Sequence, residues 1–245
     1  MDNLLGVDVS HWQGAMNWSK AAINQVHFAF IKCTQGIDFF DSRFTENWTG
    51  AGAARIWRGA YHWLEPELDP VDQADWFVDH FGTVQELEPV VDVEDSDNIP
   101  PDYETRLLIF LSRIEERTGG YRPIIYTRSS YWKVYLPNAL WADAYKLWVA
   151  NYREDSGPLV SLPWAPNRWW FWQFTSSANG PKYGASSQEI DLDVSNGELV
   201  RAAVPTAKLP PVGLLPSGTF KPLRATYQDY LEEARWKLRK NPRKD

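Results

Sequence analysis

The stretch Pro89-Val90-Val91-Asp92-Val93-Glu94 combines β-branched residues with two acids at its end. Because side chains alternate along a strand, Asp92 and Glu94 point to the same face, about 7 Å apart. Placing two acids on one face of a buried strand costs desolvation and mutual repulsion, which indicates a chemical use. Barrel enzymes carry their chemistry at the carboxyl ends of parallel strands, so we interpret this stretch as a barrel strand that ends in an active site.

Runs of β-branched and aromatic residues alternate with amphipathic stretches through most of the first 200 residues. Strands are expected near residues 4–9, 26–34, 56–63, 89–94, 122–127, 147–152, 169–175 and 189–194. Helices are expected over residues 17–25, 43–55, 70–81 and 102–118. Later connections are shorter and carry turn residues. The predicted fold class is α/β, an irregular β/α barrel of the TIM type, with eight strands and fewer helices in its C-terminal half.

Two other expected strands also end in acids. Asp8 follows Gly6-Val7, and the last strand carries both Asp191 and Asp193. Of this last pair we favour Asp191, which follows Ile190, as the site residue.

A pair of carboxylates at one strand end suits the cleavage of a glycosidic bond. Repulsion raises the pKa of one acid, which can then protonate the leaving oxygen while the other stays ionised. Glu94 is longer and further out, so it is the expected acid, with Asp92 as the ionised partner. A cation site is the competing use of clustered acids, although no DxDxDG-type loop is present. Solvated acids that merely cap a strand end are a further alternative.

Charge and composition exclude several function classes. The net charge is −7, and residues 1–204 carry 16 basic against 28 acidic residues, which disfavours nucleic acid as a partner. No run of about 20 apolar residues is present, so no membrane span is expected. The four histidines show no metal-binding spacing, so no metal or other cofactor is predicted. The first residues lack the basic and apolar regions of a secretory signal peptide.

The C-terminal part differs in composition from the rest. Residues 205–222 hold five prolines and suggest a tether that follows a catalytic barrel over residues 1–204. Residues 223–245 carry apolar side chains at helical spacing among basic ones, which predicts a basic amphipathic helical tail. Such a tail could pack on the barrel, dock to a virion or other protein partner, or bind an anionic surface.

Several motifs occur together in one order along the chain. They are residues 6–14 (GVDVSHWQG), 59–63 (GAYHW), 91–94 (VDVE), 125–127 (IYT), 147–152 (LWVANY), 172–173 (WQ) and 190–192 (IDL). In this order they resemble the family-25 glycoside hydrolases, the Chalaropsis-type lysozymes. The resemblance covers about residues 4–197 and leaves out the tail.

The resemblance implies an irregular β/α barrel that cleaves the β-1,4 bond between N-acetylmuramic acid and N-acetylglucosamine in peptidoglycan. By position, the catalytic residues would be Glu94 as general acid, with Asp92, Asp8 and Asp191. The positions that match sugar-contacting groove residues are Tyr61, Tyr126, Trp148 and Gln173, for which simple packing is the alternative role. Attack could come from a carboxylate or from the acetamido oxygen of the substrate, oriented by Asp92 and Tyr126; the resemblance favours the second, with retention.

The sequence therefore predicts a muramidase, and the missing signal peptide suggests a phage-type lysin. Such an enzyme would stay in the host cytoplasm until its release to the cell wall, or would be carried in the virion. The alternative function is a virion-associated structural or glycan-binding component that docks through residues 223–245. A chitin-directed hydrolase is a third interpretation, which the absence of a DxxDxDxE run disfavours.

Overall fold

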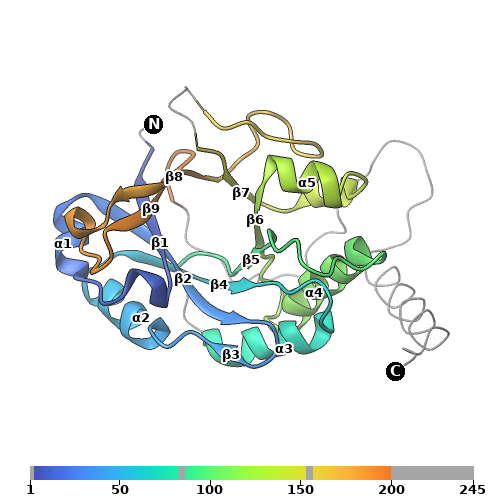
Figure 1. Cartoon of the computed structure of the whole chain (residues 1–245), viewed down its shortest axis with the longest axis horizontal. Coiled ribbons are helices and arrows are strands. Elements are labelled where there is room, and N and C mark those ends of the chain that lie inside the picture. Colours follow the sequence, from blue (N-terminus) through green and yellow to red (C-terminus); the bar gives the residue numbers. More distant parts are fainter. Residues whose placement is uncertain (1–2, 83–85, 153–156, 200–245) are drawn as a thin grey trace.

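The computed structural model describes residues 3–82, 86–152 and 157–199, and its centre is a closed barrel (Figure 1). The predicted tether, 205–222, and the predicted helical tail, 223–245, lie outside the described residues. The barrel strands are β1 (Leu5–Val9), β2 (Val26–Gln35), β4 (Trp57–Trp63), β5 (Val90–Asp92), β6 (Ile124–Arg128), β7 (Leu147–Ala150), β8 (Phe171–Asn179) and β9 (Glu189–Ser195). All eight predicted strands are confirmed. A ninth, β3 (Phe39–Phe40), was not predicted and pairs with the end of β2.

The barrel closes because β1 is bonded to both β2 and β9. Neighbouring strands run parallel from β1 through β2 to β8, whereas β9 is antiparallel to both β8 and β1. The link between β8 and β9 holds only the short 3₁₀ helix η3 (Gly180–Tyr183), which is too short for a parallel crossover. The predicted irregular barrel is therefore confirmed, but as a mixed barrel and not as the all-parallel TIM type.

The helices lie on the outside of the barrel (Figure 1). The four predicted ones are α1 (Trp18–Ile23), α2 (Phe44–Ala53), α3 (Pro70–Phe81) and α4 (Tyr103–Arg117). Helix α5 (Ser129–Tyr135), which follows β6 directly, was not predicted. None of the helices in the described ranges is long and apolar enough to cross a membrane.

Strand alternation divides the buried residues into two layers. Val91 and Val93, from the segment 89–94, lie in the outer layer, between the strands and the helices. Val90 points into the barrel, where it belongs to a second cluster with Phe30 and Trp148. The rings of Phe30 and Trp148 stack with centroids 4.3 Å apart. Large aromatic side chains thus fill the part of the barrel interior that lies away from the carboxyl ends of the strands. They form the floor beneath the polar residues.

Two glycines make room for this aromatic filling. A Cβ atom on Gly6 of β1 would lie 2.3 Å from the ring of Phe28, and one on Gly59 of β4 would lie 2.8 Å from the ring of Phe30. Real Cβ atoms do not approach ring carbons this closely, so any larger residue would displace a ring or a strand. The absence of a side chain at both positions allows the rings to fill the barrel interior.

Candidate active site

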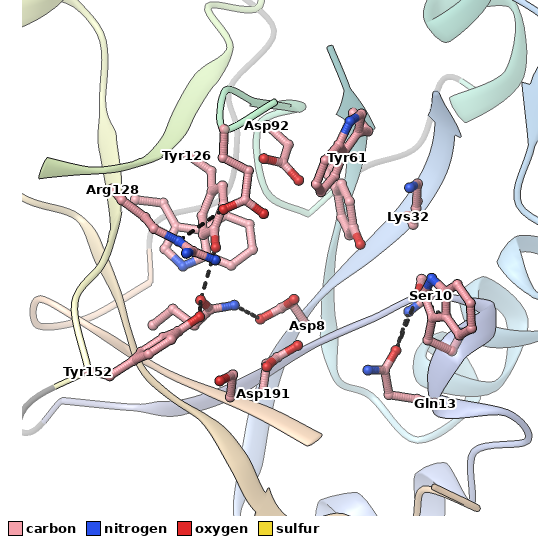
Figure 2. A pocket seen from close by; sticks show the side chains of 16 residues that line it. Asp8, Ser10, Gln13, Lys32, Tyr61, Asp92, Tyr126, Arg128, Tyr152 and Asp191 are labelled. Atoms are coloured by element: carbon pink, nitrogen blue, oxygen red, sulfur yellow. Dashed lines mark hydrogen bonds and ion pairs between the residues drawn. The ribbon is translucent and has the colours of Figure 1, made fainter. Parts of the chain in front are cut away.

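A pocket of about 310 Å³ opens at the carboxyl ends of the parallel strands (Figure 2). Its lining includes all eight site residues expected from the sequence: Asp8, Tyr61, Asp92, Glu94, Tyr126, Trp148, Gln173 and Asp191. These residues come from seven different strands or strand ends, so the barrel brings them together from across the chain.

Strand alternation explains why polar side chains gather at this end. On β6, Ile124 lies in the inner apolar cluster, Tyr126 follows it, and Arg128 reaches the pocket. On β2, Phe30 is succeeded in the same way by Lys32. Residues two apart share a face of a strand, so each inward-facing row starts apolar and ends polar.

The backbone between Asp92 and Glu94 is held by the neighbouring strand β6. The N–H of Val93 donates to the carbonyl of Tyr126 at 2.9 Å, and Thr127 Oγ1 donates to the carbonyl of Val93 at 2.8 Å. Glu94 lies two residues beyond the end of β5, yet these bonds hold its position. The segment is therefore fixed although the regular strand is only three residues long.

Asp92 is buried, with 6% of its surface exposed. Its Oδ1 atom has no hydrogen-bond partner among the described residues. Burial and the neighbouring Glu94 raise the pKa of Asp92 well above its ordinary value, while Lys32 opposes the shift. A buried carboxyl oxygen without a protein partner is costly, which makes it a ready acceptor for a donor on a bound molecule.

Glu94 forms an ion pair at the side of the pocket. Its Oε2 atom lies 3.1 Å from Nε of Arg128 (Figure 2). Burial raises the pKa of Glu94, whereas Arg128 acts in the opposite direction. Of the two coupled acids, Glu94 is thus the one whose negative charge has a cationic partner in direct contact.

A second group of acids lies across the pocket. Asp8 accepts a hydrogen bond from Nε2 of Gln173 at 2.8 Å. Burial and the proximity of Asp193 raise the pKa of Asp8 well above its ordinary value, and burial together with Asp8 raises that of Asp191 to about 9. Asp191 lines the pocket as expected, while Asp193 is fully buried and accepts from the indole of Trp148 at 2.8 Å.

The expected sugar-contacting residues differ in how far a ligand can reach them. The amide oxygen of Gln173 is fully used, because it accepts from the hydroxyls of Tyr126 and Tyr152, each at 2.9 Å. Tyr61 is 9% exposed, and Trp148 only 2%. Trp148 therefore offers little surface to the pocket, because its ring packs against Phe30 and Tyr126 and its indole N–H donates to Asp193.

Sequence reasoning did not name eight residues of the lining as site residues, namely Ser10, Trp12, Gln13, Lys32, Trp63, Arg128, Tyr152 and Ser176. Lys32 is 6% exposed, donates to Oε1 of Gln35 at 2.7 Å and lies 4.9 Å from the ring of Trp63. The signal for two of them was the period of two, since Lys32 follows inward-facing Phe30 and Arg128 follows inward-facing Tyr126. Within the described ranges, no three His, Cys, Asp or Glu side chains are grouped so as to hold a metal ion.

A barrel whose open end joins a protonatable acid to a second carboxyl two residues away is the arrangement of a glycoside hydrolase. Comparison with known proteins defines the family. Residues 7–183 match the model of glycosyl hydrolases family 25. The chain belongs to this family, and it is a glycoside hydrolase of the lysozyme (1,4-β-N-acetylmuramidase) kind.

Individual relatives agree with this assignment. The chain is 34% identical over 213 residues to lysozyme M1 of Streptomyces globisporus, covering 80% of this chain and 69% of that protein. It is 26% identical over 208 residues to the N,O-diacetylmuramidase of Chalaropsis, covering 78% and 95%. The crystal structure of a lysozyme from Streptomyces coelicolor superposes with a TM-score of 0.74 at 31% identity, covering 84% of this chain and 100% of that one. The family resemblance read from the sequence is confirmed.

Proposed function

We propose that the enzyme hydrolyses the β-1,4 bond between N-acetylmuramic acid and N-acetylglucosamine in peptidoglycan with Glu94 as general acid and Asp92 as the group that orients the substrate. The carrying observation is the Asp92 carboxyl, which is buried beside Glu94 and whose Oδ1 atom finds no hydrogen-bond partner in the part of the chain that the structure describes. An acetamido N–H is a donor of the kind that this oxygen lacks.

In the proposed reaction, the proton of Glu94 passes to the glycosidic oxygen as the bond from C1 to that oxygen breaks. The acetamido oxygen of the N-acetylmuramic acid unit forms a bond to C1 of that same unit and gives a cyclic oxazolinium ion. Asp92 accepts the hydrogen bond of the acetamido N–H. Water then attacks C1 as the bond from C1 to the acetamido oxygen breaks, which restores the acetamido group, and the water yields a proton to the Glu94 carboxylate. Two inversions at C1 give net retention, one of the exceptions to the two-carboxylate scheme.

Substitution of Glu94 tests the role of the acid. Glu94→Gln keeps the size and the polar contacts but has no proton to donate, so we expect clearing of a cell-wall suspension to slow by at least about 100-fold. Asp97→Asn is the matched control, because Asp97 is an exposed acid three residues away. Equal clearing by Glu94→Gln and the control would exclude Glu94 as the acid.

A second experiment separates the two routes of attack. A thiazoline analogue of the oxazolinium ion should inhibit competitively, and intact-protein mass spectrometry should show no glycosyl adduct during turnover. A covalent adduct on Asp92 or Asp191 would replace the acetamido route by direct carboxylate attack.

We further propose that the enzyme acts as a phage-type lysin, with residues 223–245 as its docking segment to a virion or other protein partner. The support is the basic, helix-periodic sequence of that segment, which lies outside the described residues. The full chain should then co-sediment with phage particles, and a chain without residues 205–245 should not. Equal sedimentation of the two chains would exclude docking through this segment.

A further inference from the structure

Arg128 is the last residue of β6 and lies where the pocket meets solvent. Its side chain is 51% exposed, and the partner carboxyl of Glu94 is 15% exposed. The guanidinium carbon also lies 5.9 Å from the centre of the Tyr152 ring. Figure 2 shows Arg128 between Tyr126 and Tyr152, with its guanidinium directed into the pocket.

This ion pair opposes the task assigned to Glu94. A general acid must carry a proton, whereas a guanidinium 3.1 Å away stabilises the ionised carboxylate. The other charged or titratable groups that act on Glu94 are Asp8 of β1, Lys32 of β2, Asp92 of β5, Asp95 of the following loop, Tyr126 of β6 and Asp191 of β9. Among them the carboxylates favour a protonated Glu94, and Lys32 acts with Arg128 against it. Protonation of Glu94 is therefore easiest when Arg128 has another partner.

The exposed position of Arg128 suggests what that partner is. Two cationic side chains line the pocket, Lys32 and Arg128. Lys32 is 6% exposed and already bonded to Gln35, so of the two cationic side chains that line the pocket in the described part of the chain, Arg128 is the one that an entering anion can reach. A muramyl sugar without a peptide stem carries a free lactyl carboxylate, and a muramyl sugar with a stem carries the carboxylates of the peptide instead. Either presents the pair of oxygens that a planar guanidinium binds with two parallel hydrogen bonds.

We propose that Arg128 binds a carboxylate of the glycan substrate and that this exchange of partners releases Glu94 to act as the acid. The inference rests on the proposed role of Glu94 and adds a recognition site for the anionic part of the substrate. Glu94 would then hold its proton more easily when a carboxylate-bearing glycan is bound than when the pocket is empty.

Kinetics on three soluble glycans test the recognition step. The first is a peptide-free glycan with free lactyl carboxylates, the second is the same glycan with those groups converted to neutral amides, and the third bears peptide stems. Arg128→Gln should raise KM about tenfold on at least one carboxylate-bearing glycan and by less than about twofold on the amidated one. Arg128→Lys, which keeps the charge without the planar fork, should fall between.

The change in KM across the three glycans also identifies which group of the substrate supplies the carboxylate. A rise in KM on the peptide-free glycan assigns the lactyl group, and a rise confined to the third glycan assigns the peptide stem. An equal rise on amidated and carboxylate-bearing glycans, or no rise on any, overturns the proposal.

The pH profile tests the release of Glu94. Loss of activity at high pH in kcat/KM reports the free enzyme, and in kcat the bound complex. In the wild type the basic limb of kcat should lie at higher pH than that of kcat/KM. In Arg128→Gln the kcat/KM limb should move to higher pH and the gap should narrow, because the charge that holds Glu94 ionised is gone. Unchanged limbs in the variant overturn the coupling.

A matched control is Arg43→Gln, since Arg43 is 39% exposed and pairs with Glu46 on the outer helix α2. It should leave both KM and the pH limbs as in the wild type. Failure of the wild type itself to cleave any of the glycans would contradict the proposed function. Wild-type cleavage with an unaltered Arg128→Gln variant contradicts only the role of Arg128.

Discussion

The acids of this pocket show how a single residue type serves chemistry at the expense of stability. Asp8, Asp191 and Asp193 crowd one side of the barrel, and burial raises the pKa of each. Few cationic groups oppose the shift on this side, whereas Glu94 and Asp92 face Arg128 and Lys32. Ionising these three acids in the folded state is therefore unfavourable at neutral pH.

We expect Asp193→Asn to stabilise the fold at neutral and alkaline pH. A carboxyl whose pKa is raised in the folded state above its ordinary value of 3.8 holds its proton there while the unfolded chain loses it, so stability falls as the pH rises. Asparagine removes this loss and still accepts the indole N–H of Trp148. At pH 8 the free energy of unfolding should rise by about 1–3 kcal/mol. Chemical denaturation between about pH 4 and pH 9 would measure it.

The comparison protein for this test is Asp97→Asn, because that residue is exposed. It should follow the wild type at every pH. An Asp193→Asn variant that is less stable than the wild type at pH 8 would show that the carboxylate is ionised and well solvated there.

Strands β1 and β2 pack closely because a glycine of β1 lies against an aromatic ring of β2. Their parallel register brings Gly6 opposite Phe28. The inner aromatic cluster depends on this close approach, because Phe28 also contacts Phe171 of β8 with ring centroids 5.1 Å apart. A change on β1 is thus transmitted across the barrel.

Gly6→Ala should destabilise the fold by about 1–3 kcal/mol, because the new Cβ atom would lie 2.3 Å from the Phe28 ring. The measurement is urea unfolding. Pairing the substitution with Phe28→Leu, which removes the ring, should make the effect of Gly6→Ala smaller than in the wild-type background. If the cost of Gly6→Ala were the same in both backgrounds, contact with the ring would not be its cause.

The whole molecule combines an acidic barrel with a basic C-terminal sequence. Residues 205–245 carry 9 basic against 4 acidic residues, in contrast to the acidic excess of residues 1–204. Cell walls present carboxylates, so the two parts should have opposite effects on the encounter with the substrate. The pairing of β1 with β9 that closes the barrel runs from Leu5 opposite Val194 to Asp8 opposite Asp191.

A chain that ends at Val204 should accordingly remain folded, with a Tm close to that of the full chain. Its clearing of walls should be slower than that of the full chain at about 20 mM salt, and the difference should shrink at about 200 mM salt, where charges are screened. Melting curves and wall clearing at the two salt concentrations measure both effects. A salt-independent difference would show that charge is not what the C-terminal residues contribute.

Much of this architecture follows from local pattern. Runs of β-branched and aromatic residues predicted all eight barrel strands, because strands buried on both faces are apolar along most of their length, and amphipathic stretches between them predicted α1 to α4. The same alternation placed Asp92 and Glu94 on one face, and the ordered motifs selected the other expected site residues. Pocket geometry now brings all of these together, while their individual roles remain predictions.

Other features depended on contacts between distant parts of the chain. The antiparallel direction of β9 follows from how the barrel closes on β1, and the burial of Asp193 beneath Trp148 follows from the same closure. The ion pair of Arg128 with Glu94 joins the ends of β5 and β6, which the predicted barrel makes neighbours, but the sequence did not show that these two side chains meet. Local sequence determined which side chains face inward, because alternation is a property of a single strand. Only the tertiary structure decided which of them meet, because strand order, register and closure are settled by packing the whole barrel at once.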